Sequence, residues 1–175
     1  MLLEGRRCRI RSWRPNDIDA LVEHANDFEV ARQLRDRFPH PYARQNARTF
    51  LEFAVKEDSG NLAIEVDGEA VGAIGFVPGS DIERFSAEVG YWVGRRIWGR
   101  GVATDALLTL TAHLFSEHRL LRLFALPFAD NAGSIRVLEK AGYVCEGRLR
   151  ASSVKHGTVR DQLLYARINE GWRLA

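Results

Sequence analysis

A glycine-rich turn between a predicted strand and a predicted helix constrains the fold of this chain more than any other stretch. It lies within residues 91–104, which read YWVGRRIWGRGVAT. Apolar residues then recur at helical spacing, which predicts a helix with one face packed on a core: Ala103, Ala106, Leu107, Leu110, Leu114 and Phe115. The start of this helix stays open, so we expect a functional site there.

The chemistry that this turn favours is anion binding. Closely spaced glycines let the backbone approach a ligand, and the exposed N–H groups of a helix's first turn attract a phosphate. Arg95, Arg96 and Arg100 add positive charge. The competing interpretation is a tight turn without a ligand. The stretch contains neither a Gly-x-x-x-x-Gly-Lys-Ser/Thr sequence nor the third glycine of the dinucleotide fingerprint, so neither nucleotide motif fits.

Length and composition predict one soluble domain over residues 1–175. The chain is 46% hydrophobic and 27% charged, which is ordinary for a globular protein with a sizeable core. A formal net charge of +2 gives no concentrated basic face, so we expect no nucleic-acid partner. No positively charged stretch followed by an apolar one opens the sequence, and no run approaches ~18 apolar residues. We therefore expect a cytoplasmic protein that does not bind membranes.

The hydrophobic periods predict alternating elements along the chain. A first strand covers residues 6–14, with Cys8, Ile10 and Ser12 on one side and its arginines on the wet side of an edge strand. Cys8 and Cys145 are predicted as small core residues in buried strands. Helices are expected from Pro15 to Ala25, at 29–35, 43–56, from Gly101, and at 131–142; strands are expected at 61–66, 70–77, 86–93, 122–126, 143–150 and 159–168.

Two connections have specific signatures. Asp67-Gly68-Glu69 predicts a β-hairpin. Residues 38–42 contain two prolines and cannot be regular structure; this aromatic loop either caps the core, which we favour, or lines a substrate pocket. The whole order predicts a mixed α/β sheet with parallel crossovers, in which ligands bind at the carboxyl ends of strands.

Three segments, taken together, resemble the GCN5-related N-acetyltransferases, the GNAT superfamily. They are residues 87–93 (AEVGYWV), the turn at 91–104, and residues 131–143 (NAGSIRVLEKAGY). The most similar branch is the RimJ/RimL type, which acetylates protein N-terminal amines. The resemblance spans residues 61–168 and implies a single-domain mixed sheet with splayed central strands and helices on both faces.

The resemblance implies that acetyl-CoA binds at the turn as a co-substrate, without a metal. Backbone amides would hold its diphosphate at Gly99, Arg100, Gly101, Val102, Ala103 and Thr104. The common family pattern has Arg or Gln where this chain has Trp98, a substitution that the RimJ/RimL branch shares, so we expect backbone rather than side-chain capture. At Trp92 and Val93 a bulge would open the strand edge to the pantetheine arm, and a backbone N–H there would polarise the thioester carbonyl.

Asn131 and Ser134 match the family's Asn-x-x-Ser. The resemblance implies that Asn131 contacts the pantetheine arm and that the Ser134 hydroxyl protonates the departing thiolate. From the residues alone, the pair equally fits an N-cap of the following helix. Both roles are compatible, because a helix start that needs capping can also face the cofactor.

A base must take a proton from the acceptor ammonium, because only a neutral amine attacks a thioester. Glu88 is the first candidate, since a partly buried carboxylate holds a proton more readily. It fits equally well as a solvated strand residue or as the partner of an arginine. His24, His113 and His118 lie on predicted helices and receive no role, and His156 reads as a turn residue.

The expected reaction is direct acetyl transfer from acetyl-CoA to a primary amine. A protein N-terminus is the first acceptor, on the branch resemblance alone; polyamines, aminoglycosides and other small amines remain alternatives. A different class of function is a non-catalytic acyl-CoA sensor or interaction module. Many relatives are dimers, so a homodimer is compatible with the resemblance.

Overall fold

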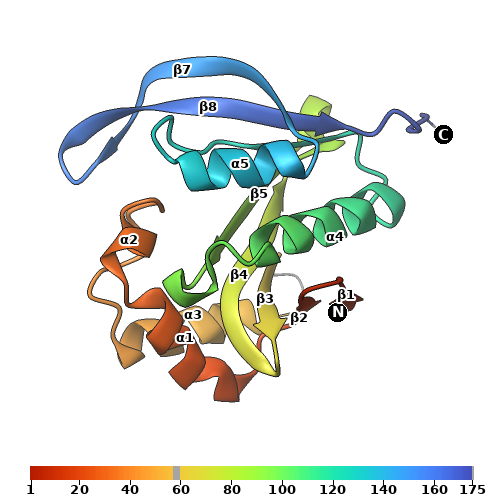
Figure 1. The fold of residues 1–175 in the computed structure, drawn as a ribbon. Coiled ribbons are helices and arrows are strands. Elements are labelled where there is room, and N and C mark those ends of the chain that lie inside the picture. Colours follow the sequence, from red (N-terminus) through yellow and green to blue (C-terminus); the bar gives the residue numbers. More distant parts are fainter. Residues whose placement is uncertain (57–59, 175) are drawn as a thin grey trace. The chain divides into compact units, whose positions relative to one another are not determined.

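The computed structural model describes residues 1–56 and 60–174. The chain divides into two compact units, Met1–Gly75 with Tyr91–Ala106 and Phe76–Gly90 with Leu107–Ala175. It passes between them within strands β4 (Glu69–Pro78) and β5 (Ser86–Val93) and within helix α4 (Val102–Ser116) (Figure 1). The single domain expected over residues 1–175 stays a prediction.

Three helices of the first unit lie between residues 18 and 54. They are α1 (Ile18–Ala25), α2 (Phe28–Ala31) and α3 (Arg44–Ala54), with 3₁₀ turns at Pro15–Asp17 and Arg95–Ile97. Leu21 of α1 and Leu51 of α3 join Ala63 and Ala73 of the strands in one buried cluster, because their apolar residues fall on one helical stripe. The predicted helices are confirmed, with ends that differ by a few residues.

Four strands of the first unit, counted within residues 1–56 and 60–75, form an antiparallel ladder. They are β1 (Leu2–Glu4), β2 (Arg9–Arg11), β3 (Asn61–Val66) and the first part of β4. Asp67 and Gly68 both have positive φ, the backbone that a two-residue hairpin turn requires, so the predicted hairpin is confirmed. Ala63 and Ile64 are both fully buried although successive strand residues face opposite ways, so both faces of β3 are covered.

The second unit combines a parallel pair with a long hairpin. Strand β5 runs parallel to β6 (Arg122–Ala125), β6 pairs antiparallel with β8 (Thr158–Ile168), and β8 pairs with β7 (Val144–Lys155). Helix α5 (Ala132–Lys140) is fastened to β8, because Arg167 donates to the Ala141 carbonyl at 2.8 Å and Tyr165 donates to Glu139 at 3.2 Å. A short 3₁₀ turn covers Asp81–Glu83.

Within the described residues the strands form one eight-stranded sheet in the order β1-β2-β3-β4-β5-β6-β8-β7. The mixed α/β sheet with a parallel crossover is therefore confirmed. The ladder between β5 and β6 covers Ser86 to Glu88, opposite Arg122 to Phe124, and β5 continues beyond it. Among the residues described, no helix is long and apolar enough to cross a membrane.

The first strand was predicted as a single edge strand, which is wrong. Residues 6 and 7 lie in the turn of a hairpin, and the edge strand is β1, so β2 is covered by neighbours on both sides. Arg11 is only 3% exposed, and its guanidinium lies 2.7 Å from Asp17 and also pairs with Glu65. The hydrogen bonds that Arg11 donates to Asp17 and Glu65 outweigh the effect of burial and raise the pKa of Arg11.

The two cysteines differ in their exposure to solvent. Cys8 is buried as predicted, but Cys145 is exposed on β7, an edge strand of the sheet. Period-two apolar spacing cannot tell a strand with one covered face from an edge strand whose side chains stay in water. Both thiols are free, so no disulfide links them.

Candidate functional site

The glycine turn of the first unit has the backbone that an anion site needs. Gly99 and Gly101 have φ of +76° and +77°, in the left-handed region that favours glycine. The Asp105 N–H donates to the Gly101 carbonyl at 3.0 Å, which is the first helical hydrogen bond of α4. The N–H groups of the three residues before Asp105 therefore precede the helical ladder and remain available at the positive end of the helix dipole.

Space around the turn fits a bulky phosphate group. A Cβ built on Gly99 would meet nothing within 4 Å, and one built on Gly101 would meet only the side chain of Arg7, at 3.3 Å. The backbone of the turn is therefore accessible, and an accessible run of N–H groups ahead of a helix fits a diphosphate. Val102 at the helix start is buried, whereas Ala103 and Thr104 are half-buried.

Trp98 is tied to the end of strand β5. Its indole N–H donates to the Val93 carbonyl at 2.9 Å, so the side chain closes the turn on the strand that precedes it. Trp98 is about half exposed. A donor that is used in this way does not point to side-chain capture of a ligand.

Strand β5 is irregular near Trp92. A Cβ on Gly72 of β4 would lie 2.2 Å from the Trp92 carbonyl oxygen and 2.8 Å from the Val93 Cα. In a regular ladder carbonyls lie in the plane of the sheet and Cβ atoms stand out of it. The Trp92 carbonyl therefore leaves the ladder plane, which is the local distortion that a bulge produces.

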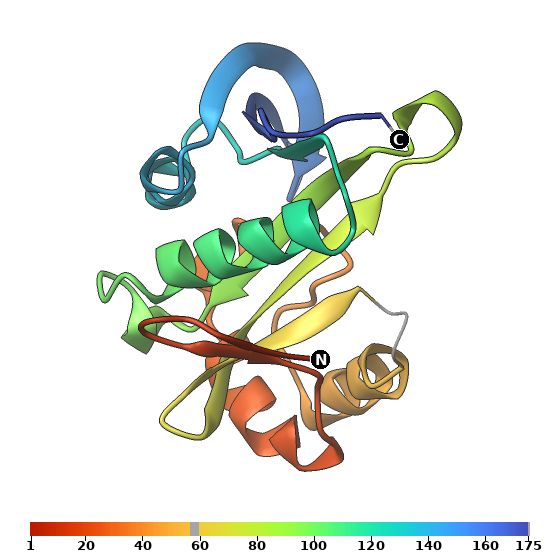
Figure 2. The same ribbon diagram turned by 90° about the vertical axis from the view of Figure 1, so that its right-hand side faces the viewer.

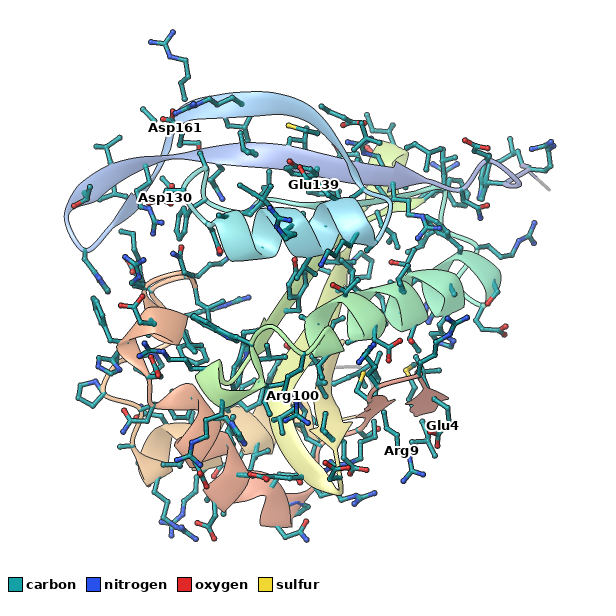
Figure 3. The ribbon with its side chains drawn as sticks, in the orientation of Figure 1. Glu4, Arg9, Arg100, Asp130, Glu139 and Asp161 are labelled. Atoms are coloured by element: carbon teal, nitrogen blue, oxygen red, sulfur yellow. The ribbon has the colours of Figure 1, made fainter. Side chains whose placement is uncertain are left out.

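The arginines around the turn are not equivalent. Arg95 lies 3.9 Å from Asp27, and Arg96 forms an ion pair with Glu23. Arg100 is exposed between the two glycines (Figure 3). The positive charge predicted from all three arginines is therefore partly neutralised by acidic residues of the first unit.

Asn131 and Ser134 lie together at the start of α5 in the second unit. The Asn131 side-chain oxygen accepts the Ser134 backbone N–H at 3.1 Å, so Asn131 is the N-cap of this helix. The capping interpretation of the pair is confirmed for Asn131. Both residues are half-buried, and the cofactor and leaving-group roles stay predictions.

Glu88 is half-buried in β5, where it is the last residue of the parallel ladder, opposite Phe124. The side chain lies where β5 and β6 cease to pair. Its role as a base stays a prediction.

The segment that presents Asn131 is held by strand β8, which the sequence did not indicate. The Arg160 guanidinium stacks 3.7 Å from the centre of the Phe128 ring and pairs with Asp130. The Gln162 side chain donates to the Leu126 carbonyl at 2.9 Å. In Figure 3, the label Asp130 locates the segment before α5 and the label Asp161 locates strand β8.

His24 is a second residue whose place the sequence did not indicate. It is 6% exposed, and its Nε2 lies 2.9 Å from Glu69. A Cβ on Gly94 would lie 2.2 Å from its Nδ1, so the ring occupies the space that Gly94 leaves. The prediction that nothing recruits His24 is wrong, because its partner Glu69 is distant in sequence and belongs to β4.

The loop at residues 38–42 joins the core of the first unit. Phe38 packs edge-on against Trp92 at 5.3 Å between ring centres and contacts Tyr42 at 5.1 Å. Burial raises the pKa of Tyr42 to about 12. The favoured interpretation, a loop that caps the core, agrees with these contacts.

Within the residues described, no group of three His, Cys, Asp or Glu side chains could hold a metal ion.

Comparison with known proteins identifies the family. Residues 7–144 match the family described as "Acetyltransferase (GNAT) domain". The chain is 35% identical over 169 residues to the uncharacterized N-acetyltransferase YoaA of Bacillus subtilis (strain 168), covering 94% of this chain and 95% of that protein. It is 30% identical over 127 residues to the ribosomal-protein-serine acetyltransferase of Escherichia coli (strain K12), covering 73% of this chain and 64% of that one.

A solved structure has the same fold. Mycobacterium smegmatis RimJ in complex with CoA-disulfide superposes with a TM-score of 0.85 at 24% identity, covering all of this chain and 90% of that one. The predicted resemblance to the GNAT superfamily is confirmed by the family match, and the RimJ structure shows that the fold is shared. The family match extends over most of the chain and includes the open glycine turn, Asn131 and Ser134. This chain belongs to the GNAT family of acetyltransferases.

Proposed function

We propose that this chain transfers the acetyl group of acetyl-CoA to the N-terminal amine of a protein, and that residues 1–175 form one acetyltransferase domain. The observation that carries the proposal is the glycine turn, whose two left-handed glycines leave the backbone accessible ahead of α4. The diphosphate binds there, at Gly99 to Thr104, through the main-chain N–H groups of Val102, Ala103 and Thr104 ahead of the helical ladder. No metal is required, because main-chain amides and the exposed Arg100 meet the charge.

The thioester end of acetyl-CoA lies against the end of β5. The distortion at Trp92 and Val93 supports this, because an irregular strand end leaves main-chain groups unpaired. A main-chain N–H at that point stabilises the oxyanion that forms when the amine attacks, an interaction of roughly 3 kcal/mol in other enzymes. The Gly94 N–H is not that donor, because it already binds the Val71 carbonyl at 2.8 Å.

The chemistry is a direct attack without an acyl-enzyme. The acceptor nitrogen bonds to the thioester carbon, the carbon–sulfur bond breaks, and the sulfur leaves as a thiolate that takes a proton from the Ser134 hydroxyl. Ser134 regains a proton from the attacking nitrogen, which loses its second proton as it becomes the amide. Asn131 contacts the pantetheine arm and also holds the Ser134 backbone. Glu88 accepts the proton that the acceptor ammonium releases, directly or through water.

The proposal also names the acceptor, the amine that receives the acetyl group. A protein N-terminus is favoured because an identified relative, at 30% identity, is a ribosomal-protein-serine acetyltransferase. The loop with Phe38 and Tyr42 lies against Trp92, so it can contact an acceptor that approaches the end of β5. A small amine such as a polyamine is the alternative acceptor, and a screen of N-terminal peptides against small amines, read by free thiol release, decides between them.

Substitution of Gly101 tests the turn. Gly101→Glu places a bulky negative side chain on the proposed diphosphate site, and Gly101→Ala is the matched control, since both variants carry the strain of a side chain at positive φ. We expect calorimetry to show loss of CoA binding in Gly101→Glu and only a partial loss in Gly101→Ala. CoA affinity that is equal in the two variants would remove the turn from the binding site. CoA binding by the wild type without thiol release when amines or N-terminal peptides are added would indicate an acyl-CoA-binding module instead of a transferase.

A further inference from the structure

The turn between β1 and β2 is fastened to the start of α4. The backbone N–H of Arg7 donates to Asp105 Oδ2 at 2.7 Å, and Cys8 Sγ lies 3.6 Å from the same oxygen. Figure 2 shows the N-terminal hairpin extending toward the turn that precedes α4. Main-chain contacts of this hairpin therefore hold residue 7 beside the glycine turn, whatever its side chain.

The guanidinium of Arg7 lies over the second glycine of the turn. Its Nη1 donates to the Arg100 carbonyl at 3.4 Å. The Cδ and Nε atoms are each 3.3 Å, and Cζ 3.8 Å, from the place where a Cβ of Gly101 would stand. The long hydrogen bond uses one of five guanidinium N–H groups, and the others remain for a ligand.

Arg7 also differs in its charge environment from the arginines that precede the turn. Arg95 and Arg96 are paired with Asp27 and Glu23. Across residues 1–56 and 60–174, the Arg7 guanidinium forms no ion pair with a carboxylate, and the side chain is exposed. An arginine whose charge is not neutralised is the side chain that best binds a phosphate, because its planar fork donates two parallel hydrogen bonds.

We propose that Arg7 is a phosphate-binding residue of this acetyltransferase and donates to a phosphate group of acetyl-CoA. The inference rests on the proposed function, since it assigns a further residue to the same turn. Coenzyme A offers this chemistry in two places, the 5′-diphosphate and the 3′-phosphate of its ribose. Both present oxygens that a guanidinium binds, and truncated ligands separate them.

The test compares CoA binding by calorimetry in wild type, Arg7→Ala and two controls. Arg6→Ala changes the exposed neighbour in the same hairpin turn, and Arg96→Ala removes a cation that Glu23 already neutralises. We expect Arg7→Ala to weaken CoA binding by about 10-fold or more, as for loss of a hydrogen bond to a charged group, and each control by less than about 2-fold. Salt should reduce the difference between wild type and Arg7→Ala, because it screens an exposed charge pair.

Truncated ligands then identify the phosphate. If the effect of Arg7→Ala disappears with 3′-dephospho-CoA, Arg7 binds the 3′-phosphate; if it persists there and disappears with acetyl-pantetheine, Arg7 binds the diphosphate. Either result supports the proposal. An effect that persists with acetyl-pantetheine would overturn it, because Arg7 would then act only by holding the turn.

Loss of CoA binding in these variants is not a consequence of misfolding. The contact with Asp105 comes from the backbone of residue 7, so it survives in Arg7→Ala, and Arg7→Gln additionally keeps an amide donor for the Arg100 carbonyl. If the wild type binds CoA and Arg7→Ala binds it with the same affinity, this inference is overturned and the proposed function stays intact. Wild type that does not bind CoA would remove both.

Discussion

The indole N–H of Trp98 donates a 2.9 Å hydrogen bond to the carbonyl of Val93, the last residue of β5. This bond closes the five-residue path from the strand to the first glycine of the turn. Trp98→Phe removes the donor and keeps an aromatic ring. We expect a loss of ~1 kcal/mol in the free energy of unfolding and a higher KM for acetyl-CoA.

Trp172→Phe is the matched control for this variant. Its indole N–H also donates to a carbonyl, that of Arg119 at 2.7 Å, but in the second unit. A similar loss of stability with an unchanged KM for acetyl-CoA is expected. If both variants raise the KM equally, the Trp98 bond has no particular connection with the turn.

Gly94 is required by the buried ring of His24. A methyl group at position 94 would lie 2.2 Å from Nδ1 and 2.8 Å from Cγ, and the ring is held on its other side by Glu69. We expect Gly94→Ala to lower the free energy of unfolding by about 1–3 kcal/mol, measured by urea denaturation, because the ring cannot move freely. Gly90→Ala is the control, since a Cβ there meets nothing within 4 Å.

The double variant Gly94→Ala with His24→Ala checks the cause. Removing the ring relieves the clash, so the two effects should be non-additive in the stabilising direction. Strict additivity would show that Gly94 is needed for a different reason.

Ser134 is expected to act on the leaving group. Ser134→Ala should lower kcat more than it raises the KM for acetyl-CoA, because the thiolate then departs without its proton donor. The N-cap is kept in this variant, since Asn131 binds the backbone N–H of residue 134. Asn131→Ala, in contrast, should cost ~1 kcal/mol of stability through loss of the cap. A Ser134→Ala change confined to KM would mean that the hydroxyl only binds.

The two thiols should differ in reactivity. Cys145 is exposed, whereas burial, assisted by Asp105, raises the pKa of Cys8 from 9.0 to about 12. In the folded protein at pH 8 we expect one fast-reacting thiol with a disulfide reagent, and none in Cys145→Ser. Two fast thiols in the wild type would contradict the burial of Cys8.

The raised pKa of Cys8 also has a consequence for stability. The folded chain holds the thiol proton more tightly than the unfolded chain, so this contribution is complete below pH 9 and is lost as the pH rises toward about 12. Thermal unfolding between pH 8 and 11 should therefore show a steeper alkaline decline for wild type than for Cys8→Ala.

Local features of the fold could be predicted because they depend on neighbours in sequence. The Asp67-Gly68 hairpin, the extent of β5, and the helix after Gly101 follow from turn chemistry and hydrophobic period within a few residues. The Asn131 cap reaches only three residues along the chain. The family pattern at the turn was likewise visible as a contiguous stretch.

Other placements depend on which strands become neighbours. Arg11 was expected in water because alternation marks two faces of a strand but not whether both are covered. In the structure its guanidinium is buried against Asp17 and Glu65. Cys145 was expected in the core by the same reasoning, but it lies on the edge strand β7. His24 received no role because its partner lies 45 residues away.

The sequence by itself determined the elements, the open glycine turn and the family, because backbone preference and helical or strand period act over short distances. Only the tertiary structure decided which charges meet. Arg7 is 98 residues from Asp105 and reaches the turn through the pairing of β1 with β2, while Arg95 and Arg96, within the turn's own segment, are neutralised by α1 and its following loop. Coulomb interactions depend on distance in space, and that distance is fixed only when the strands have paired.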